Sequence, residues 1–205
     1  TQIGAFYKTF RDFQVIVPLP NNPLLSTEQN NPNSTKLYGV EASAQAVVGD
    51  LSINANIALQ HSSLGDFYTQ DPRTGVSGVC NQETGPATTT CVNLGGNAQT
   101  YAPNFTANIQ AQYDIHMANG DTITPSVTFS HISGQWSTLF ENRSKNDYLD
   151  PRNILGATLS WTHGTLTASL YGYNLTDQHY VSANLSPIRI AGAPRQFGIS
   201  LLKAF

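Results

Sequence analysis

The side chains of this chain that could do chemistry are five histidines, two cysteines and thirteen carboxylates among 205 residues. No two histidines have the His-x-x-x-His spacing of a zinc site, and no Gly-x-Ser-x-Gly elbow or phosphate-cradling loop occurs. The sequence therefore predicts no catalytic, cofactor-binding or metal site. The histidines are His61, His116, His131, His163 and His179.

Asp114 and His116 lie two residues apart, so on a strand both side chains would point to the same face. On an inner barrel wall such a pair could act as an acid and a base. We favour a structural pair or a contact with a neighbouring domain, because no third group with a catalytic spacing accompanies it. The prediction of no enzymatic activity is unchanged.

Cys80 and Cys91 are the only cysteines, and the segment between them is polar and rich in Gly, Thr and Pro. Their spacing fits no zinc pattern. We predict that they form a disulfide in the longest loop, which would stabilise the fold by roughly 3 kcal/mol in the chain-entropy model. Such a bond requires an oxidising compartment.

The composition narrows the fold class. Charged residues make up 11% of the chain, compared with about 25% in a typical soluble domain. Hydrophobic residues make up 40%, but no run approaches the roughly 18 apolar residues of a membrane-spanning helix. The net charge of -3 gives no basic patch, so no nucleic-acid partner is expected. A polar soluble β-protein and a membrane barrel both remain possible at this point.

Apolar and polar residues alternate over long segments. In 51–60 every second residue from Leu51 to Leu59 is apolar, and the whole of 104–117 alternates without interruption. The second segment exceeds the usual strand length of about 5 to 6 residues and suits a tilted membrane strand of about 9 to 11 with an overhang. The eight predicted strands lie near 3–17, 37–48, 51–63, 103–117, 121–137, 148–162, 165–178 and 195–205.

The connections between these strands are alternately short and long. Tight turns built on Gly or Asn-Gly occur at 48–50, 118–121 and 163–164. Because antiparallel strands reverse at every connection, the short turns share one side and the long loops share the other. This asymmetry predicts an all-β, antiparallel transmembrane β-barrel with periplasmic turns and extracellular loops. The long loops lie near 18–35, 64–101, 139–147 and 178–193.

Aromatic residues flank both ends of the predicted strands. Trp161, Tyr113 and the terminal Phe205 are expected in a girdle on the periplasmic side. Packing inside a soluble sandwich is the alternative, but a sandwich would not need strands this long. The aromatics expected in an outer girdle beside the long loops are Phe67, Tyr68, Tyr101, Trp136, Phe140, Tyr148 and Tyr180.

The last strand alternates up to the end of the chain, with Phe197, Ile199, Leu201 and Phe205 on one face. In a soluble protein this hydrophobic row would be unprotected at a terminus. In a membrane barrel the row faces lipid.

The opposite faces of the predicted strands carry small or neutral residues. An eight-stranded barrel needs interior side chains that fill its core, so small residues favour a wider, hydrated or plugged barrel. These positions are Ser52, Asn54, Asn56, Thr106, Asn108, Thr122, Thr124, Ser126, Thr128, Ser130, Gly156, Thr158 and Ser160.

The C-terminal segments 166–180 and 193–205 resemble the end of a TonB-dependent outer-membrane receptor. That family's penultimate strand carries an Asn-Leu-(Thr/Phe)-Asp-x-x-Tyr motif, and its last strand starts at Pro-Arg and ends in Phe. Upstream, the Tyr-Gly-Val-Glu run at 38–41 resembles a recurrent strand start of the family. The matching motif residues are Asn174, Leu175, Asp177, Tyr180, Pro194 and Arg195.

The resemblance implies a plugged barrel of 22 strands, of which residues 1–205 would supply the last eight, with no plug domain in this segment. It implies a receptor in the bacterial outer membrane that binds a siderophore, cobalamin, carbohydrate or similar nutrient at its extracellular loops and imports it. The implied partners are the plug and earlier strands, TonB, outer-membrane lipid and lipopolysaccharide. The terminal strand would also be the signal for the barrel-assembly machinery.

A self-contained small outer-membrane barrel with a structural or adhesive role is the alternative function. A plug domain and a TonB-contacting segment upstream of Thr1 would support the receptor, whereas a signal peptide directly before Thr1 would support the small barrel. Because Thr1 is not an initiator methionine, we expect a processed chain or a fragment.

Overall fold

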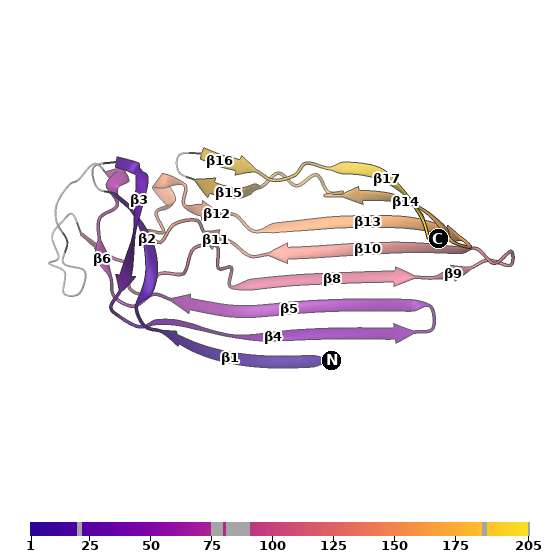
Figure 1. Ribbon diagram of the computed structural model, residues 1–205, viewed down its shortest axis with the longest axis horizontal. Helices are drawn as coiled ribbons and strands as arrows, with labels where there is room; N and C mark the ends of the chain where they lie inside the picture. Colours follow the sequence, from indigo (N-terminus) through magenta and orange to yellow (C-terminus); the bar gives the residue numbers. More distant parts are fainter. Residues whose placement is uncertain (20–21, 75–79, 81–90, 186–187, 205) are drawn as a thin grey trace.

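The computed structural model of the protein describes residues 1–19, 22–74, 80, 91–185 and 188–204. Long antiparallel strands lie side by side in one sheet (Figure 1), in the order β1-β4-β5-β8-β10-β13-β14-β17. A short strand, β9, continues β8 and pairs with β10. The bounds are β1 Gln2–Phe10, β4 Thr35–Val48, β5 Leu51–Ser63, β8 Phe105–Tyr113, β9 Ile115–His116, β10 Thr122–Ile132, β13 Arg152–His163, β14 Leu166–Tyr173 and β17 Gln196–Lys203.

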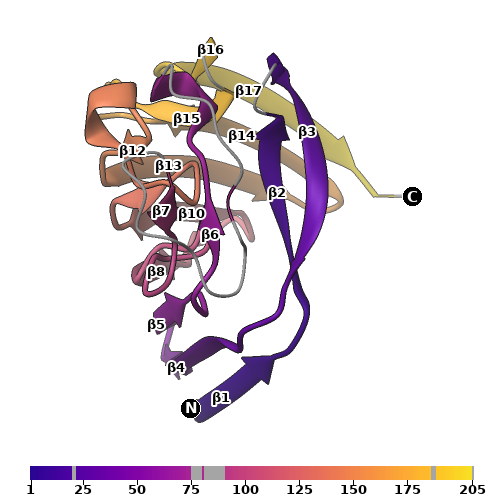
Figure 2. The ribbon, with the colours of Figure 1, turned by 90° about the vertical axis from the view of Figure 1, so that its left-hand side faces the viewer.

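The sheet is curved and open. Viewed from the end of the long loops, its strands follow an arc from β4 to β17, and the β2–β3 hairpin lies on the concave side (Figure 2). Within the described residues β1 and β17 are the two edges and do not pair with each other. The predicted all-β antiparallel class is confirmed, in the form of a partial barrel. No helix in these ranges is long and apolar enough to span a membrane.

The register divides the sheet into two faces. Asn54 pairs with Gln110, and Gln110 pairs with Thr128, so the three lie in one polar row across β5, β8 and β10. One step along, Ile53 and Val127 both pair with Ala111, which gives an apolar row on the other face. Because the strand period is two, this arrangement repeats along the sheet.

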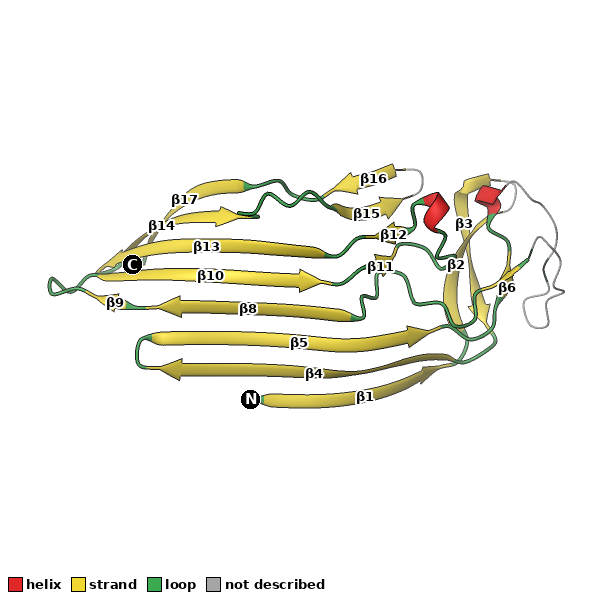
Figure 3. Ribbon diagram, turned by 180° about the vertical axis from the view of Figure 1, so that it is seen from behind, coloured by secondary structure: helices red, strands yellow, loops and turns green. Residues whose placement is uncertain are grey.

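Short turns join the strands at one end of the sheet (Figure 3). Gly49 follows β4, and Gly164 follows β13, with φ of 59° and 56°. A residue with a Cβ adopts this left-handed conformation at a steric cost, whereas glycine does not. These two glycines allow the chain to reverse within a few residues.

The other end of the sheet carries small elements that pack together as a loop layer. The β2–β3 hairpin stands nearly upright against the sheet (Figure 3). Within the described residues, the elements of the loop layer are β2 Phe13–Leu19, β3 Asn22–Asn31, β6 Tyr68–Thr69, β7 Val92–Asn93, β11 Gln135–Trp136, β12 Tyr148–Leu149, β15 Val181–Leu185, β16 Ile188–Ala191 and the 3-10 turns η1 Pro72–Thr74 and η2 Arg143–Lys145.

The predicted first strand, 3–17, was wrong because it merged two strands of different sheets. Asp12 has a φ of 52°, and this left-handed residue separates β1 from β2. Strand β2 pairs with β3 instead of with the wall, so 22–31, expected to lie in a loop, is a strand. The apolar residues Phe13, Val15 and Val17 alternate as they would in a wall strand, which explains the error.

Three other predicted strands extended too far into the loop layer. The predicted strand 121–137 ends as β10 at Ile132, and 148–162 is interrupted at Pro151, which has no N–H to donate to a ladder. The predicted strand 165–178 ends at Tyr173, because Asn174 has a left-handed φ of 51°.

The predicted strand 103–117 is divided at Asp114 into β8 and β9, which keep one register against β10.

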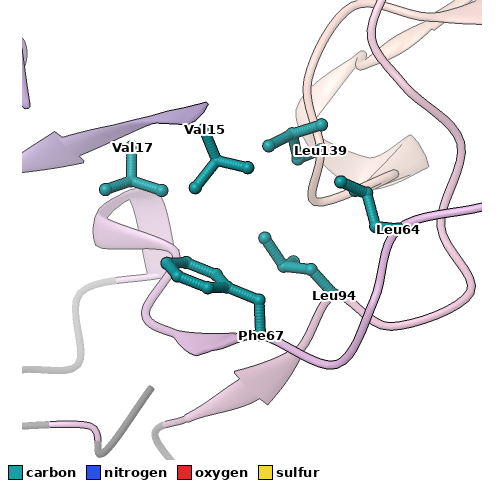
Figure 4. Close-up of a cluster of buried hydrophobic side chains, with 6 residues drawn as sticks. All are labelled: Val15, Val17, Leu64, Phe67, Leu94 and Leu139. Carbon is teal, nitrogen blue, oxygen red and sulfur yellow. The ribbon is translucent and has the colours of Figure 1, made fainter. Parts of the chain in front are cut away.

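The loop layer has its own hydrophobic cluster (Figure 4). Phe67 is fully buried in it, so its expected place in an exposed aromatic girdle was wrong. The backbone N–H of Leu94 donates to the carbonyl of Phe67, which ties two loop segments together at the cluster. The buried residues of the cluster are Val15, Val17, Leu64, Phe67, Leu94 and Leu139.

Truncation of Phe67 tests whether this cluster holds the loop layer. We expect Phe67→Ala to lower the free energy of local unfolding of the loops by about 3–5 kcal/mol, because it removes a fully buried ring. Hydrogen exchange at the Leu94 amide measures the opening. The control is Ile16→Ala, on the exposed face of β2, which should change it little. If the Leu94 amide is equally protected from exchange in Phe67→Ala and in Ile16→Ala, Phe67 does not hold the loop layer together.

Candidate functional site

The polar face of the sheet forms a shallow hollow of about 530 Å³. Asn56, Asn108 and Ser130 line it, and they form one cross-strand row that continues to Ser43 on β4. Glu41 contributes a carboxylate to the same lining. This face presents hydrogen-bonding groups of small size, which suits contact with water or with the polar surface of another domain.

The apolar face includes the outward row of the terminal strand. Phe197, Ile199 and Leu201 have exposed fractions of 68%, 79% and 74%, and they alternate with Gly198 and Ser200 on the polar face. A row this exposed and this apolar needs a nonpolar environment. Phe205, expected in the same row, lies outside the described residues.

An arginine and two aspartates connect separate segments of the loop layer. The Arg73 guanidinium contacts the carboxylates of Asp71 and Asp147, and Asp147 is fully buried. Burial alone would raise the pKa of Asp147, but hydrogen bonds from Arg73, Thr138 and the Asn142 backbone together lower it. Asp147 therefore remains ionised and fixes the loop that follows β11.

Protonation of Asp147 tests this role. Its folded-state pKa lies below the unfolded value of about 3.9, so its carboxylate stabilises the loop layer above that pH. This contribution is lost as the pH falls through the folded pKa. We expect the Ser137 amide, which donates to the Asp147 carbonyl, to lose exchange protection as the pH falls below the unfolded value and through the folded pKa, after correction for intrinsic rates.

Asp147→Asn is the control for this acid response, because the amide cannot titrate. This substitution should reduce the exchange protection of the Ser137 amide at neutral pH. It should also make the loss of that protection on acidification smaller than in the parent chain. The same protection in the parent chain at neutral and acid pH would show that the carboxylate does not hold the loop.

The Asn174 side chain holds the corner after β14. It is fully buried, its Nδ2 donates to the carbonyls of Gln178 and Ala193, and its Oδ1 accepts from the Gln178 backbone N–H. The Leu175 N–H donates to the Leu155 carbonyl, which ties the corner to β13. The Asn-Leu run of the motif thus reverses the chain and fastens it to the sheet.

The other motif residues lie around the same corner. The Arg195 backbone N–H donates to Asp177, and the Arg195 guanidinium lies 3.7 Å from that carboxylate. Pro194 follows Ala193, whose carbonyl accepts from Asn174. The structure therefore brings Asn174, Asp177 and Arg195 together, and their geometry is that of a structural corner.

Substitution of Asn174 tests this interpretation. We expect Asn174→Ala to cost roughly 2–4 kcal/mol, because it removes buried hydrogen bonds and places a Cβ residue at a left-handed φ. In Asn174→Gly the glycine adopts the left-handed φ without strain, and only the hydrogen bonds are lost. This variant should therefore lower the free energy of unfolding by less than Asn174→Ala does. Denaturant unfolding of the barrel in detergent measures both, and an Ala variant as stable as the parent would refute the role of the corner.

An arginine and three tyrosines, which the sequence analysis did not group, converge beside this corner. The Arg152 guanidinium lies 5.2 Å from the centre of the Tyr180 ring, and Tyr173 interacts electrostatically with Tyr180 and Arg152. Tyr171 and Tyr173 are 44% and 40% exposed. Tyr171 and Tyr173 share a face of β14, whereas the positions of Arg152 and Tyr180 beside them depend on the register and on the path of the loop.

The histidines are not grouped as a metal site would require. Among the described residues, no three His, Cys, Asp or Glu side chains are placed to hold a metal ion. His116 contacts Asp50, at 3.4 Å, and Asp114 accepts a hydrogen bond from Thr124 instead of from His116. The structure therefore does not join Asp114 and His116 as a pair, and their contact with a neighbouring domain stays a prediction.

Asp121 organises the end of the short turns. Its carboxylate accepts hydrogen bonds from the Trp161 indole N–H at 2.8 Å and from His163 at 2.6 Å. The hydrogen bond with His163, followed by those from Trp161 and Asn119, lowers the pKa of Asp121. Trp161, predicted to lie in the periplasmic girdle, thus has a partner for its N–H within the chain.

Cys80 and Cys91 are joined in a disulfide, with a Cα–Cα distance of 5.9 Å. Cys80 follows η1 and Cys91 precedes β7, so the bond joins two points of the connection between these elements.

A single antiparallel sheet with one polar and one apolar face, short turns at one end and a loop layer at the other, defines the class of outer-membrane β-barrel walls. Residues 1–175 match the family model "TonB dependent receptor-like, beta-barrel". The chain belongs to this family, as the C-terminal resemblance predicted. Such receptors are transport proteins of the Gram-negative outer membrane. No curated protein sequence matches the chain.

Solved structures with a similar fold are siderophore receptors. The ferric yersiniabactin uptake receptor FyuA from Yersinia pestis has a TM-score of 0.71 and 17% identity, over 99% of this chain and 27% of that receptor. The siderophore receptor PiuA from Acinetobacter baumannii has a TM-score of 0.65 and 14% identity, over 98% of this chain and 25% of PiuA. The ferric-catecholate import receptor Fiu from K12 E. coli has a TM-score of 0.64 and 15% identity, over 99% of this chain and 25% of Fiu. The chain spans about a quarter of the length of these receptors.

Proposed function

We propose that this chain is part of the barrel wall of a TonB-dependent receptor that binds a nutrient ligand at its loop end and imports it. The observation that carries the proposal is the two-faced antiparallel sheet in a chain whose residues 1–175 match the family. The polar face lines the lumen, the apolar face contacts lipid, the loop layer is extracellular, and the short turns and the C-terminus are periplasmic.

Further strands complete the barrel. The edges β1 and β17 do not pair with each other within the described residues, and exposed strand edges are not tolerated in a bilayer. The small polar residues of the inner face favour a wide lumen that holds a plug. These features make a self-contained eight-stranded barrel the weaker candidate, and they give the chain its partners: the remaining strands, the plug and, through the plug, TonB.

Ferric siderophores are the ligand class that we favour. FyuA is a ferric yersiniabactin uptake receptor, Fiu is a ferric-catecholate import receptor, and PiuA is a siderophore receptor. A cobalamin or carbohydrate ligand remains the second choice. The same proposal makes the chain a transporter without enzymatic activity.

The terminal strand has a second role in this proposal. The exposed row of Phe197, Ile199 and Leu201 contacts lipid in the finished barrel and, with Phe205, is recognised by the barrel-assembly machinery during insertion. Lipopolysaccharide surrounds the loop end of the wall.

Uptake by whole cells tests the function. Cells that produce the full-length protein containing this chain, and no other siderophore receptor, should accumulate radiolabelled iron from at least one ferric siderophore in a panel. Cells without TonB should not, because transport draws on the energy that TonB relays. Cobalamin and maltodextrin serve as alternative substrates. Uptake that is the same with and without TonB for every substrate would refute the proposal.

A further inference from the structure

Four arginines have described contacts. Arg73 and Arg195 have carboxylate partners, whereas Arg143 and Arg152 lie over aromatic rings and have no carboxylate partner among the described residues. Arg73 is paired with Asp71 and Asp147, and Arg195 is paired with Asp177. Within the described residues no carboxylate lies within 4.0 Å of the Arg152 guanidinium, which contacts the Tyr180 ring instead. A cation–π contact satisfies the face of a guanidinium and leaves its N–H edge free to donate.

Arg152 and two tyrosines belong to the polar face of the wall. Arg152 pairs with Ile132, and Ile132 pairs with Thr106. This cross-strand row lies two residues along β10 from the Asn108–Ser130 row of the hollow, toward the loop layer. Tyr171 pairs with Thr158, which is on the same face of β13 as Arg152, and Tyr173 follows two residues later. The group therefore lies on the inner face, where β13 and β14 approach the loop layer (Figure 1).

Two glycines make room for the tyrosine rings. A Cβ at Gly198 would meet the Tyr171 ring, and a Cβ at Gly192 would meet the Tyr180 ring. Tyr180 is thus held between the backbone at Gly192 and the Arg152 guanidinium. The rings and the arginine are preorganised by backbone contacts.

The hydroxyls of this group also have hydrogens to donate. Tyr173 is 40% exposed, and its phenol O–H can donate a hydrogen bond to a group that binds on this face. The residues beside them on the polar face, Thr158 and Gln196, are uncharged. Among the described residues, the surface thus combines phenol donors with an arginine that has no carboxylate within 4.0 Å.

We propose that Arg152, Tyr173 and Tyr180 form a binding site on the inner wall for an oxygen-rich anionic group, such as a carboxylate or catecholate of an iron chelate. The planar guanidinium edge matches the two oxygens of such a group, and a free phenol adds a third donor. The inference rests on the proposed receptor function, and it selects anionic over cationic ligands of that receptor.

Equilibrium binding to the full-length protein in detergent tests the site. The probes are the ferric complex of 2,3-dihydroxybenzoate and ferric citrate, which are anionic, and ferrioxamine B, which is cationic. We expect Arg152→Gln to raise the Kd for an anionic probe about tenfold or more, because hydrogen bonds to charged groups are lost. Arg189→Gln, which removes the same charge from the exposed β16, should change it less than about twofold.

Two further variants keep the test independent of folding. Tyr173→Phe removes only a hydroxyl and should weaken anionic binding about two- to tenfold. Gly192→Ala should displace the Tyr180 ring and weaken it as well. Heat-modifiable migration on gels reports whether each variant has a folded barrel.

The proposal is overturned if folded Arg152→Gln and Tyr173→Phe bind the anionic probes as the parent does. It is also overturned if the parent binds only the cationic chelate. In both cases TonB-dependent uptake would continue, so the receptor function would survive. The loss of TonB-dependent uptake for every substrate would instead remove the receptor function itself.

Discussion

Hydrogen bonding between the backbones of neighbouring strands is the constraint on which the rest of the structure depends. A bilayer offers no water to unpaired N–H and C=O groups, so a membrane wall must satisfy them from strand to strand. The unbroken ladder from β1 to β17 does this for the described wall. It also requires neighbours for the two edge strands, because each would otherwise present a row of unpaired groups to lipid.

The ladder fixes the chemistry of both faces. Because the side-chain period is two, a slip of one residue would exchange Asn108 and Ile109 between the polar and the apolar face. The left-handed residues that change the chain direction, Asp12 and Asn174, lie at the loop end, where β1 and β14 stop. Beyond the wall, the Phe67 cluster and the Arg73–Asp147 pair hold the loop layer together by contacts of its own.

Alternation predicted the wall strands well where they are long and regular, as from Leu51 to Ser63. It failed at Phe13–Val17, because a strand of a loop hairpin that packs on a hydrophobic cluster alternates just as a lipid-facing strand does. The motif around Asn174 was visible in the sequence, but its role as a corner depends on carbonyls at Gln178 and Ala193. Arg152 and Tyr180 are separated by a long stretch of chain, and no local pattern predicts that they meet.

Site-directed spin labelling of the full-length protein in lipid bilayers tests the two-faced wall most directly. Single cysteines at Asn108 and Ile109, neighbours on β8, would carry the label while Cys80 and Cys91 remain bonded. The account predicts that the label at Ile109 collides mainly with lipid-soluble oxygen and the label at Asn108 mainly with a water-soluble nickel chelate. Equal accessibility of both labels to both reagents, or the reverse preference, would contradict it.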